Sequence, residues 1–173
     1  FGGQCYGNVV AGNFIGTDAS GASALGNALD GIYMGPNNKR NQIGGDGGQD
    51  VNIISGNKRF GVFIDTCTGA VICSSAIGVS PSGARLGNAM DGVRMHYSSQ
   101  IVLGGSNDAT RNIIAGNSQN GVHMYRCSGN DIRFNFIGLN AAGAAVSNTL
   151  NGILEEESSG QAISDNVISG NGE

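Results

Sequence analysis

Apolar residues recur along the chain in a short pattern that returns about every thirty residues. The pattern is a tetrapeptide of Asn, an apolar residue, Ile and a small residue. It occurs at six places: Asn13–Gly16, Asn52–Ser55, Ser75–Gly78, Asn112–Ala115, Asn135–Gly138 and Asn166–Ser169. The third position is Ile in all six copies, and the first is Asn in five. An internal repeat of this length is typical of a solenoid or a propeller.

Each repeat contains two further apolar sites. Gly followed by Ile or Val forms a second marker, at Gly31, Gly61, Gly92, Gly121 and Gly152. A third apolar site lies between this marker and the tetrapeptide, at Val10, Ile43, Ile72, Leu103, Ile132 and Ile163. Such short strands cannot bury their apolar side chains alone, so copies must stack at a spacing of about 4.8 Å. We therefore predict an all-β, three-sided β-solenoid with columns of Ile in its core and stacked Asn side chains at a corner.

The repeat divides a single domain, residues 1–173, into six coils of two alternating kinds. Their boundaries are 1–30, 31–60, 61–91, 92–120, 121–151 and 152–173. The first, third and fifth coils carry a long loop after the tetrapeptide, at 17–30, 79–91 and 139–151. The second and fourth carry a different loop before it, after the Gly pairs at 44–45 and 104–105. Helical spacing of apolar residues is absent, and the segments are too short for the blades of a propeller.

The composition argues against two classes of function. With 9 Lys and Arg and a net charge of −4, the chain lacks the basic surface that binds phosphate backbones, so we expect no nucleic-acid partner. No apolar run approaches the roughly 18 residues of a membrane span. The sequence shows no signal-peptide pattern, so a secretion signal is expected to have been removed or to lie outside this sequence.

Five motifs with echoes in later coils lie at Asn8–Asp18, Leu25–Asn27, Asp30–Ile32, Ile43–Gly45 and Asn52–Asn57. Together they resemble the right-handed parallel β-helix repeat proteins of the pectate-lyase-like superfamily, over essentially the whole chain. The resemblance implies the right hand of the helix. It does not imply one function, because that superfamily includes polysaccharide lyases, hydrolases and epimerases, phage tail spikes, adhesins and repeat regions of large secreted bacterial proteins. The alternating loops look most like the last group, which implies a secreted or cell-surface location.

The outward side of the strand after each Gly-Ile/Val marker is the best candidate surface. Alternation along a strand predicts two outward rows on successive coils. One row is Tyr33, Phe63, Arg94, His123 and Leu154, and the next is Gly35, Asp65, His96, Tyr125 and Glu156. Arg126 and Glu157 follow at the turn. The resemblance implies that this face forms a substrate groove in related polysaccharide enzymes.

Three interpretations of this face remain open. A lyase or epimerase needs a base and a cation, for which the candidates are Asp65, Arg94, His96, His123 and Tyr125. Non-catalytic glycan binding would use Tyr33, Phe63, Arg94, His96, His123, Tyr125 and Arg126. The third interpretation is a solvated face whose residues vary freely between coils, and the row lacks the dense Asp cluster with Arg expected from calcium-dependent pectate lyases.

The acidic residues give no firm metal site, and no cofactor is expected. The calcium candidates are Thr17-Asp18, Asp30, Asp46, Asp50 and Glu155–Glu157. None has the carboxylate density of a dedicated calcium loop, so loop solvation is favoured over calcium binding. Glu155 stands where other coils place an inward Met or Ile, so either the core ends there or the strand register shifts.

Three cysteines, Cys5, Cys67 and Cys127, occupy the same position in alternate coils. Two coils correspond to about 9.6 Å, beyond the roughly 7 Å limit between the Cα atoms of a disulfide. We therefore expect them to be small, semi-buried core residues. Cys73 could pair only with Cys67, across one turn of the same coil. No Cys-x-x-Cys motif indicates zinc.

The two ends of the sequence match in phase and show no capping element. Phe1 aligns with Phe63 and Glu173 with Arg59, so a second copy could stack head to tail and continue the alternation of coils. We therefore predict a structural or adhesive extracellular module, either a filament subunit or part of a longer repetitive chain. A non-enzymatic role is favoured, with a polysaccharide-active enzyme or a glycan-binding module as the alternatives.

Overall fold

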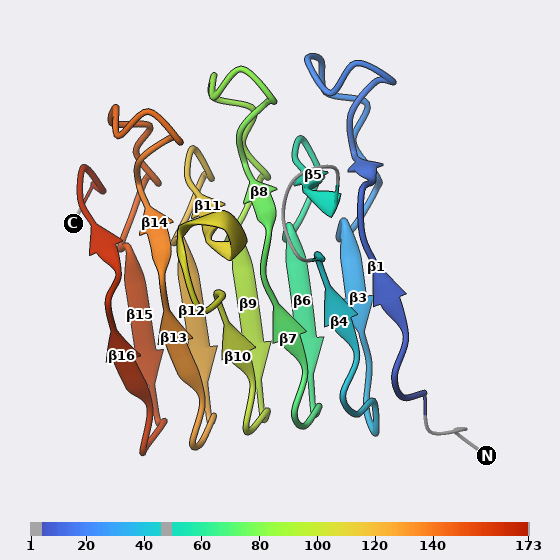
Figure 1. Ribbon diagram of the computed structural model, residues 1–173, viewed down its shortest axis with the longest axis vertical. Helices are drawn as coiled ribbons and strands as arrows, with labels where there is room; N and C mark the ends of the chain where they lie inside the picture. Colours follow the sequence, from blue (N-terminus) through green and yellow to red (C-terminus); the bar gives the residue numbers. More distant parts are fainter. Residues whose placement is uncertain (1–4, 46–49, 173) are drawn as a thin grey trace.

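The computed structural model describes residues 5–45 and 50–172, and its strands form three parallel sheets (Figure 1). The first sheet contains β1 (Val9–Val10), β4 (Gln42–Ile43), β7 (Val71–Ile72), β10 (Val102–Leu103), β13 (Asp131–Arg133) and β16 (Ala162–Ser164). The second contains β2 (Phe14–Ile15), β5 (Asn52–Ile54), β8 (Ser75–Ile77), β11 (Asn112–Ile114), β14 (Asn135–Ile137) and β17 (Val167–Ile168). The third contains β3 (Ile32–Met34), β6 (Val62–Asp65), β9 (Val93–His96), β12 (Val122–Tyr125) and β15 (Ile153–Glu156).

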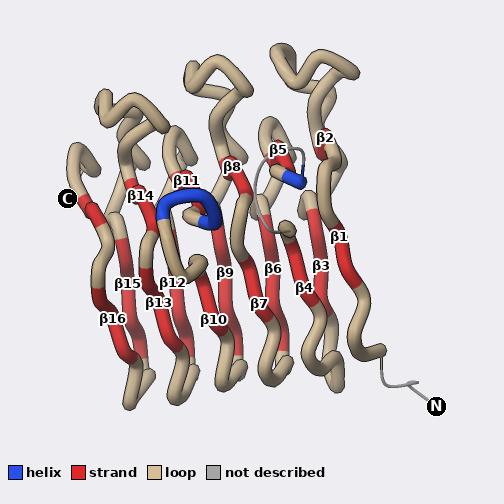
Figure 2. Tube along the Cα trace, viewed as in Figure 1, coloured by secondary structure: helices blue, strands red, loops and turns tan. Residues whose placement is uncertain are grey.

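The path of the chain is that of a right-handed parallel β-helix, as predicted. In Figure 1 it rises along the near sheet, descends along the far sheet and advances from right to left. Each strand pairs with the equivalent strand of the neighbouring coil. A short 3-10 helix, η2 (Asp108–Thr110), lies in the loop that follows β10 (Figure 2). Among the described residues, no helix is long and apolar enough to cross a membrane. The predicted phase match of Phe1 and Glu173 falls outside the described residues.

The interior consists of stacked apolar columns. The third residue of the tetrapeptide forms one of them, and its members Ile54, Ile77, Ile114 and Ile137 are fully buried. Val62, Val93 and Val122 form another in the third sheet. Glu155 pairs in register with Met124 but is exposed, so the register does not shift and the core ends at that strand.

The second residue of the tetrapeptide points outward and forms a separate apolar cluster. Ile53, Ala76 and Ile113 are buried on the outer side of the second sheet. Val79 covers them from a long loop, and Phe136 and Val146 pack against the same cluster. The long loops thus shield a second, smaller core.

Two asparagine ladders bind the coils together. The tetrapeptide forms the predicted one: Asn112 donates to Asn135 at 3.0 Å, and Asn135 donates to Asn166 at 2.9 Å. A second ladder was not predicted. Its members are Asn27, Asn57, Asn88, Asn117, Asn148 and Asn171, and each side-chain amide donates to the side-chain oxygen of the next member at 2.9–3.0 Å. Alternate members lie within a long loop or in the short turn directly after a tetrapeptide. Both kinds of coil therefore return to the same corner.

The cysteines are partly as expected. Cys67 and Cys127 are buried, whereas Cys5 is exposed. Cys67 is a free thiol, so the Cys67–Cys73 pairing is not made in this structure. Burial raises the pKa of the Cys67 thiol to about 11, which suits a packing role and not a reactive one.

Candidate functional site

The outward residues of the third sheet lie in the predicted register. Phe63, Arg94, His123 and Leu154 are successive neighbours across β6, β9, β12 and β15. Asp65, His96, Tyr125 and Glu156 form the next row on the same strands. The structure therefore brings every predicted catalytic and glycan-binding residue onto one surface. We call this surface, with the corner residues that follow each strand, the aromatic face.

Rings on four successive strands form a continuous series across the aromatic face. The centroids of Tyr33 and Phe63 are 5.3 Å apart, and those of Phe63 and His96 are 6.5 Å apart. His96 and Tyr125 are stacked, with centroids 5.1 Å apart and planes at 30°. The outer member Tyr33 is 54% exposed. The series is thus most open at Tyr33, and the rings of Phe63, His96 and Tyr125 are half-buried.

The corner after each strand widens the face. Thr66, Tyr97, Arg126 and Glu157 all have positive φ, between 47° and 57°. Tyr97 is 47% exposed and lies 4.4 Å from His96 and 5.9 Å from Tyr125, centroid to centroid. The sequence pattern did not single out Tyr97, although it occupies the same repeat position as Arg126.

Phe60 and Arg59 were also missed. Phe60 packs 5.3 Å from Phe63, and the Arg59 guanidinium lies 5.2 Å from both ring centroids. Arg59 Nε donates to Asp30 Oδ1 at 2.7 Å. The sequence did contain a signal for Phe60. This residue stands where the other coils have Asp or Asn before the Gly-Ile/Val marker.

Arg126 connects the side chains around Tyr125, the last ring of the series. Its guanidinium lies 5.0 Å from the Tyr125 ring centroid, donates to Glu157 at 2.6 Å and donates to the Tyr97 hydroxyl at 2.8 Å. Tyr125 also donates to Glu157 at 3.3 Å. These hydrogen bonds fix the orientation of the two exposed tyrosine rings.

A polar network joins two residues of the first outward row, Arg94 and His123, to the buried Asp91. Arg94 donates to Nδ1 of His123, and Nε2 of His123 donates to Glu156 at 2.8 Å. Asp91, fully buried, lies 3.5 Å from both Arg94 and His123. Asn120 donates to Asp91 at 2.8 Å from its side chain. The sequence did not predict a role for Asp91 at this site. An Asp or Asn before the marker Gly recurs in most coils, so the pattern indicates a structural position.

The two histidines differ in how accessible their rings are to a ligand. Both ring nitrogens of His123 have partners and the residue is 7% exposed, so it cannot reach a substrate as a base. His96 is more open, with 31% of its side chain exposed and Nδ1 3.6 Å from Asp65 Oδ1. The residues of the alternative catalytic interpretation are thus close in space, yet Arg94 and His123 are engaged with each other and with acidic groups.

Replacing Asp91 by Asn should make the stability of the fold decrease less steeply as the pH falls. Desolvation acts to raise the pKa of Asp91, but the interaction with His123, 3.5 Å away, and the hydrogen bonds from Asn120 outweigh it, so the pKa is lowered on folding. A lowered folded pKa gives stability that is present above the unfolded value, about 3.9, and is lost as pH falls through the folded value. Asn fits this position, because Asn120 and Asn151 continue the same stack. Melting temperatures between pH 2 and 6 should fall less steeply for the variant.

The control for Asp91→Asn is Asp108→Asn. The Asp108 side chain is 86% exposed and lies on another face. Its variant should retain the wild-type slope of melting temperature against pH. Equal slopes for wild type and Asp91→Asn would contradict the stabilising role of the Asp91 carboxylate.

Two of the calcium candidates, Asp18 and Asp30, have other partners. Asp18 Oδ1 accepts hydrogen bonds from Ser20 and Ala22 within its own loop, and Asp30 binds Arg59. Asp46 lies outside the described residues. Within residues 5–45 and 50–172, no group of three or more His, Cys, Asp and Glu side chains is placed to hold a metal ion.

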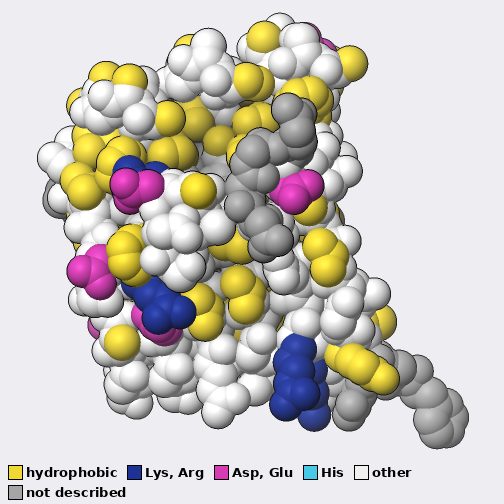
Figure 3. Space-filling view, viewed as in Figure 1, with side chains coloured by type: hydrophobic (Ala, Val, Ile, Leu, Met, Phe, Trp, Pro, Cys, Tyr) yellow, Lys and Arg dark blue, Asp and Glu magenta, His cyan; other side chains and the backbone are white. Residues whose placement is uncertain are grey.

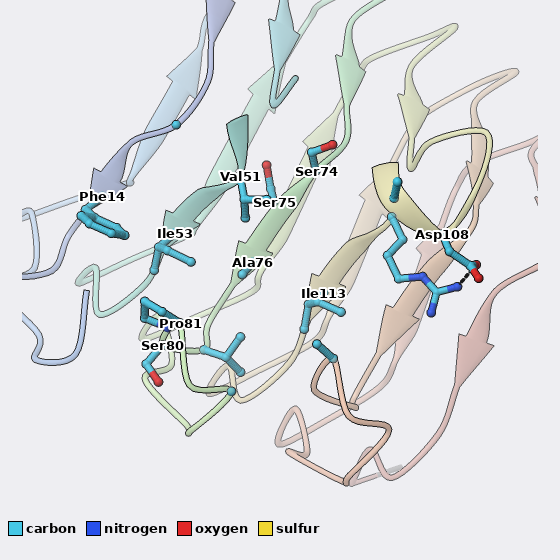
Figure 4. Close-up of a pocket in the computed structure, with 16 residues that line it drawn as sticks. Phe14, Val51, Ile53, Ser74, Ser75, Ala76, Ser80, Pro81, Asp108 and Ile113 are labelled. Carbon is cyan, nitrogen blue, oxygen red and sulfur yellow. Dashed lines mark hydrogen bonds and ion pairs between the residues drawn. The ribbon is translucent and has the colours of Figure 1, made fainter. Parts of the chain in front are cut away.

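A groove of about 710 Å³ lies on a different side, over the second sheet. Figure 3 shows apolar side chains gathered beneath the long loops, and Figure 4 shows Ile53, Ala76 and Ile113 in its floor. Pro81 lies on one side and Asp108 on the other. The groove was not predicted, because it depends on the outward second residue of each tetrapeptide.

Comparisons with known proteins give one similar structure. No family model matches the chain, and no curated protein matches its sequence. Among solved structures, the chain is similar to the A-module of the mannuronan C-5 epimerase AlgE4 of Azotobacter vinelandii, with a TM-score of 0.35 and 16% identity. The match covers 82% of this chain and 55% of that one, so this chain spans about half the length of that structure. A similarity at this level does not bear on activity.

Proposed function

We propose that this chain is an adhesive, non-catalytic module that binds polysaccharide along the aromatic face. The observation that supports this most directly is the series of rings on β3, β6, β9 and β12, with centroids 5.1–6.5 Å apart. A pyranose ring has an apolar face of C–H groups that packs against an aromatic ring, while its hydroxyls need hydrogen-bonding partners. Asp65, Glu156 and Arg126 border the rings and provide such partners.

Binding accounts for the face better than catalysis does. Arg94 and His123, the pair that could have acted as cation and base, bind each other and Asp91 or Glu156. A preorganised platform lowers the entropy lost when a ligand binds. The hydrogen bonds of Arg126 to Tyr97 and Glu157 provide that preorganisation for the tyrosine rings.

Truncating a ring of the series should weaken glycan binding. The test begins with a glycan array, followed by calorimetric titration of the best oligosaccharide. Phe63→Ala and Tyr125→Ala should each lower affinity about tenfold, because each removes apolar contact area worth about 1.5 kcal/mol. The matched control is Phe14→Ala, which removes a ring that is 51% exposed but lies on the second sheet, away from the aromatic face. Its affinity should equal that of the wild type.

Two results would overturn this proposal. One is the absence of binding to every glycan on the array. The other is turnover: formation of unsaturated product or new reducing ends from a polysaccharide, lost in His96→Ala, would show that the face is an active site.

We further propose three features on the basis of the sequence. They are secretion or display at a bacterial cell surface, membership of the large repetitive secreted type of β-helix protein, and head-to-tail stacking of copies. A rigid stack of coils would present the aromatic face at a distance from its anchor, which suits an adhesive role. Electron microscopy of the purified chain tests the stacking, since short dispersed particles would contradict it.

A further inference from the structure

We infer that the glycan is rich in amino sugars with free amines rather than in uronates; this inference rests on the proposed function. It follows from how the charges of the aromatic face are paired. Five carboxylates and three guanidinium groups lie on or directly beneath the face among the described residues: Asp30, Asp65, Asp91, Glu156, Glu157, Arg59, Arg94 and Arg126. The face therefore has an excess of negative charge.

Each of the three arginines already has a carboxylate partner. Arg59 binds Asp30, Arg94 lies 3.5 Å from Asp91, and Arg126 binds Glu157 at 2.6 Å. A uronate that bound one of these guanidinium groups would lie beside the carboxylate that the guanidinium already holds, and the two negative charges would repel each other. A polymer of uronates is therefore disfavoured at every arginine of the face.

Two carboxylates have no arginine partner and border the rings. Asp65 interacts with His96, Thr66 and Tyr33, and Glu156 with His123. They stand in the same row as His96 and Tyr125, one at each end, with side chains 24% and 50% exposed. In this row two stacked rings lie between two accessible acids, about 14 Å apart by the coil spacing. A sugar packed on the rings can place a protonated amine against either acid.

The test compares three hexasaccharides at pH 6, where the amine of an amino sugar is protonated. They are a fully acetylated hexosamine hexamer, its fully deacetylated counterpart and a uronate hexamer. The deacetylated hexamer should bind about fivefold more tightly than the acetylated one, because two exposed ion pairs are each worth about 0.5 kcal/mol. Its affinity should fall as salt rises, whereas that of the acetylated hexamer should not. The uronate should bind most weakly.

The variant Asp65→Asn/Glu156→Gln should lose the preference for the deacetylated hexamer and keep its affinity for the acetylated one. Asp108→Asn is the control, because it removes one carboxylate from a different side of the solenoid. Tightest binding of the uronate, or equal binding of all three hexamers, would overturn the inference and leave glycan binding intact. Binding of none of them, together with an empty array, would overturn the proposed function itself.

Discussion

Gly104→Ala should lower the melting temperature by about 10 °C, corresponding to roughly 4 kcal/mol. Gly104 has φ of +117°, a conformation that side chains rarely adopt, and a Cβ there would overlap the carbonyl oxygen of Arg133. That oxygen belongs to the next coil. The spacing between coils cannot widen locally, because Asp131 N donates to Ile101 O at 2.8 Å beside it. Thermal and urea denaturation measure the loss.

Gly129→Ala separates the close approach from the backbone conformation. Gly129 also has positive φ, +62°, but a Cβ at this position would have no atom within 4 Å of it. Its substitution should lower the free energy of unfolding only by the strain of an alanine in the left-handed conformation, about 1 kcal/mol. If the two variants were equally stable, close packing of coils at Gly104 would not be a constraint on the fold.

Asn117→Ala should lower the free energy of unfolding by about 3 kcal/mol. Asn117 is fully buried in the second ladder. Its Oδ1 accepts from the Asn88 side chain at 2.9 Å and from the Asn88 backbone at 3.2 Å, and its Nδ2 donates to Asn148 at 3.0 Å. Alanine would leave the buried backbone N–H of Asn88 and one hydrogen of its side-chain amide without partners, which costs more than the lost bonds themselves. Urea denaturation of the variant measures this loss.

The matched control is Asn27→Ala, at the start of the same ladder. Asn27 is exposed, donates to Asn57 at 3.0 Å and receives nothing from a preceding member among the described residues. Its loss should cost no more than about 1 kcal/mol. A cost for Asn117→Ala as small as that for Asn27→Ala would show that the ladder does not hold the coils together.

The sequence predicted the strand register because one Ile per coil must stack on the next. It could not show that the second residue of the tetrapeptide points outward, since a strand covered on both sides is apolar at successive positions. Ile53 and Ile54 are such a pair. It also missed the ladder through Asn57 and Asn88, because these residues stand at different distances from their tetrapeptides and do not align in the repeat.

The two rows of the aromatic face were predictable, because alternation over a four-residue strand leaves no other arrangement. The partners of its side chains were not. Asp91 reaches the face from the preceding turn, and Arg59 pairs with Asp30 of another coil. Such contacts depend on side-chain rotamers, which are set by packing against residues distant in sequence. The separation of the two histidines, one sequestered and one open, therefore required the structure.

Glycan binding along the aromatic face is tested most directly by titrating ¹⁵N-labelled protein with the best array oligosaccharide and following the amide shifts by NMR. We expect the shifts to move along β6, β9 and β12 and at the corners that carry Tyr97 and Arg126. Shifts over the groove at Ile53 and Ile113 should stay fixed. Movement confined to the groove or the long loops, with the aromatic face unchanged, would contradict binding at this face.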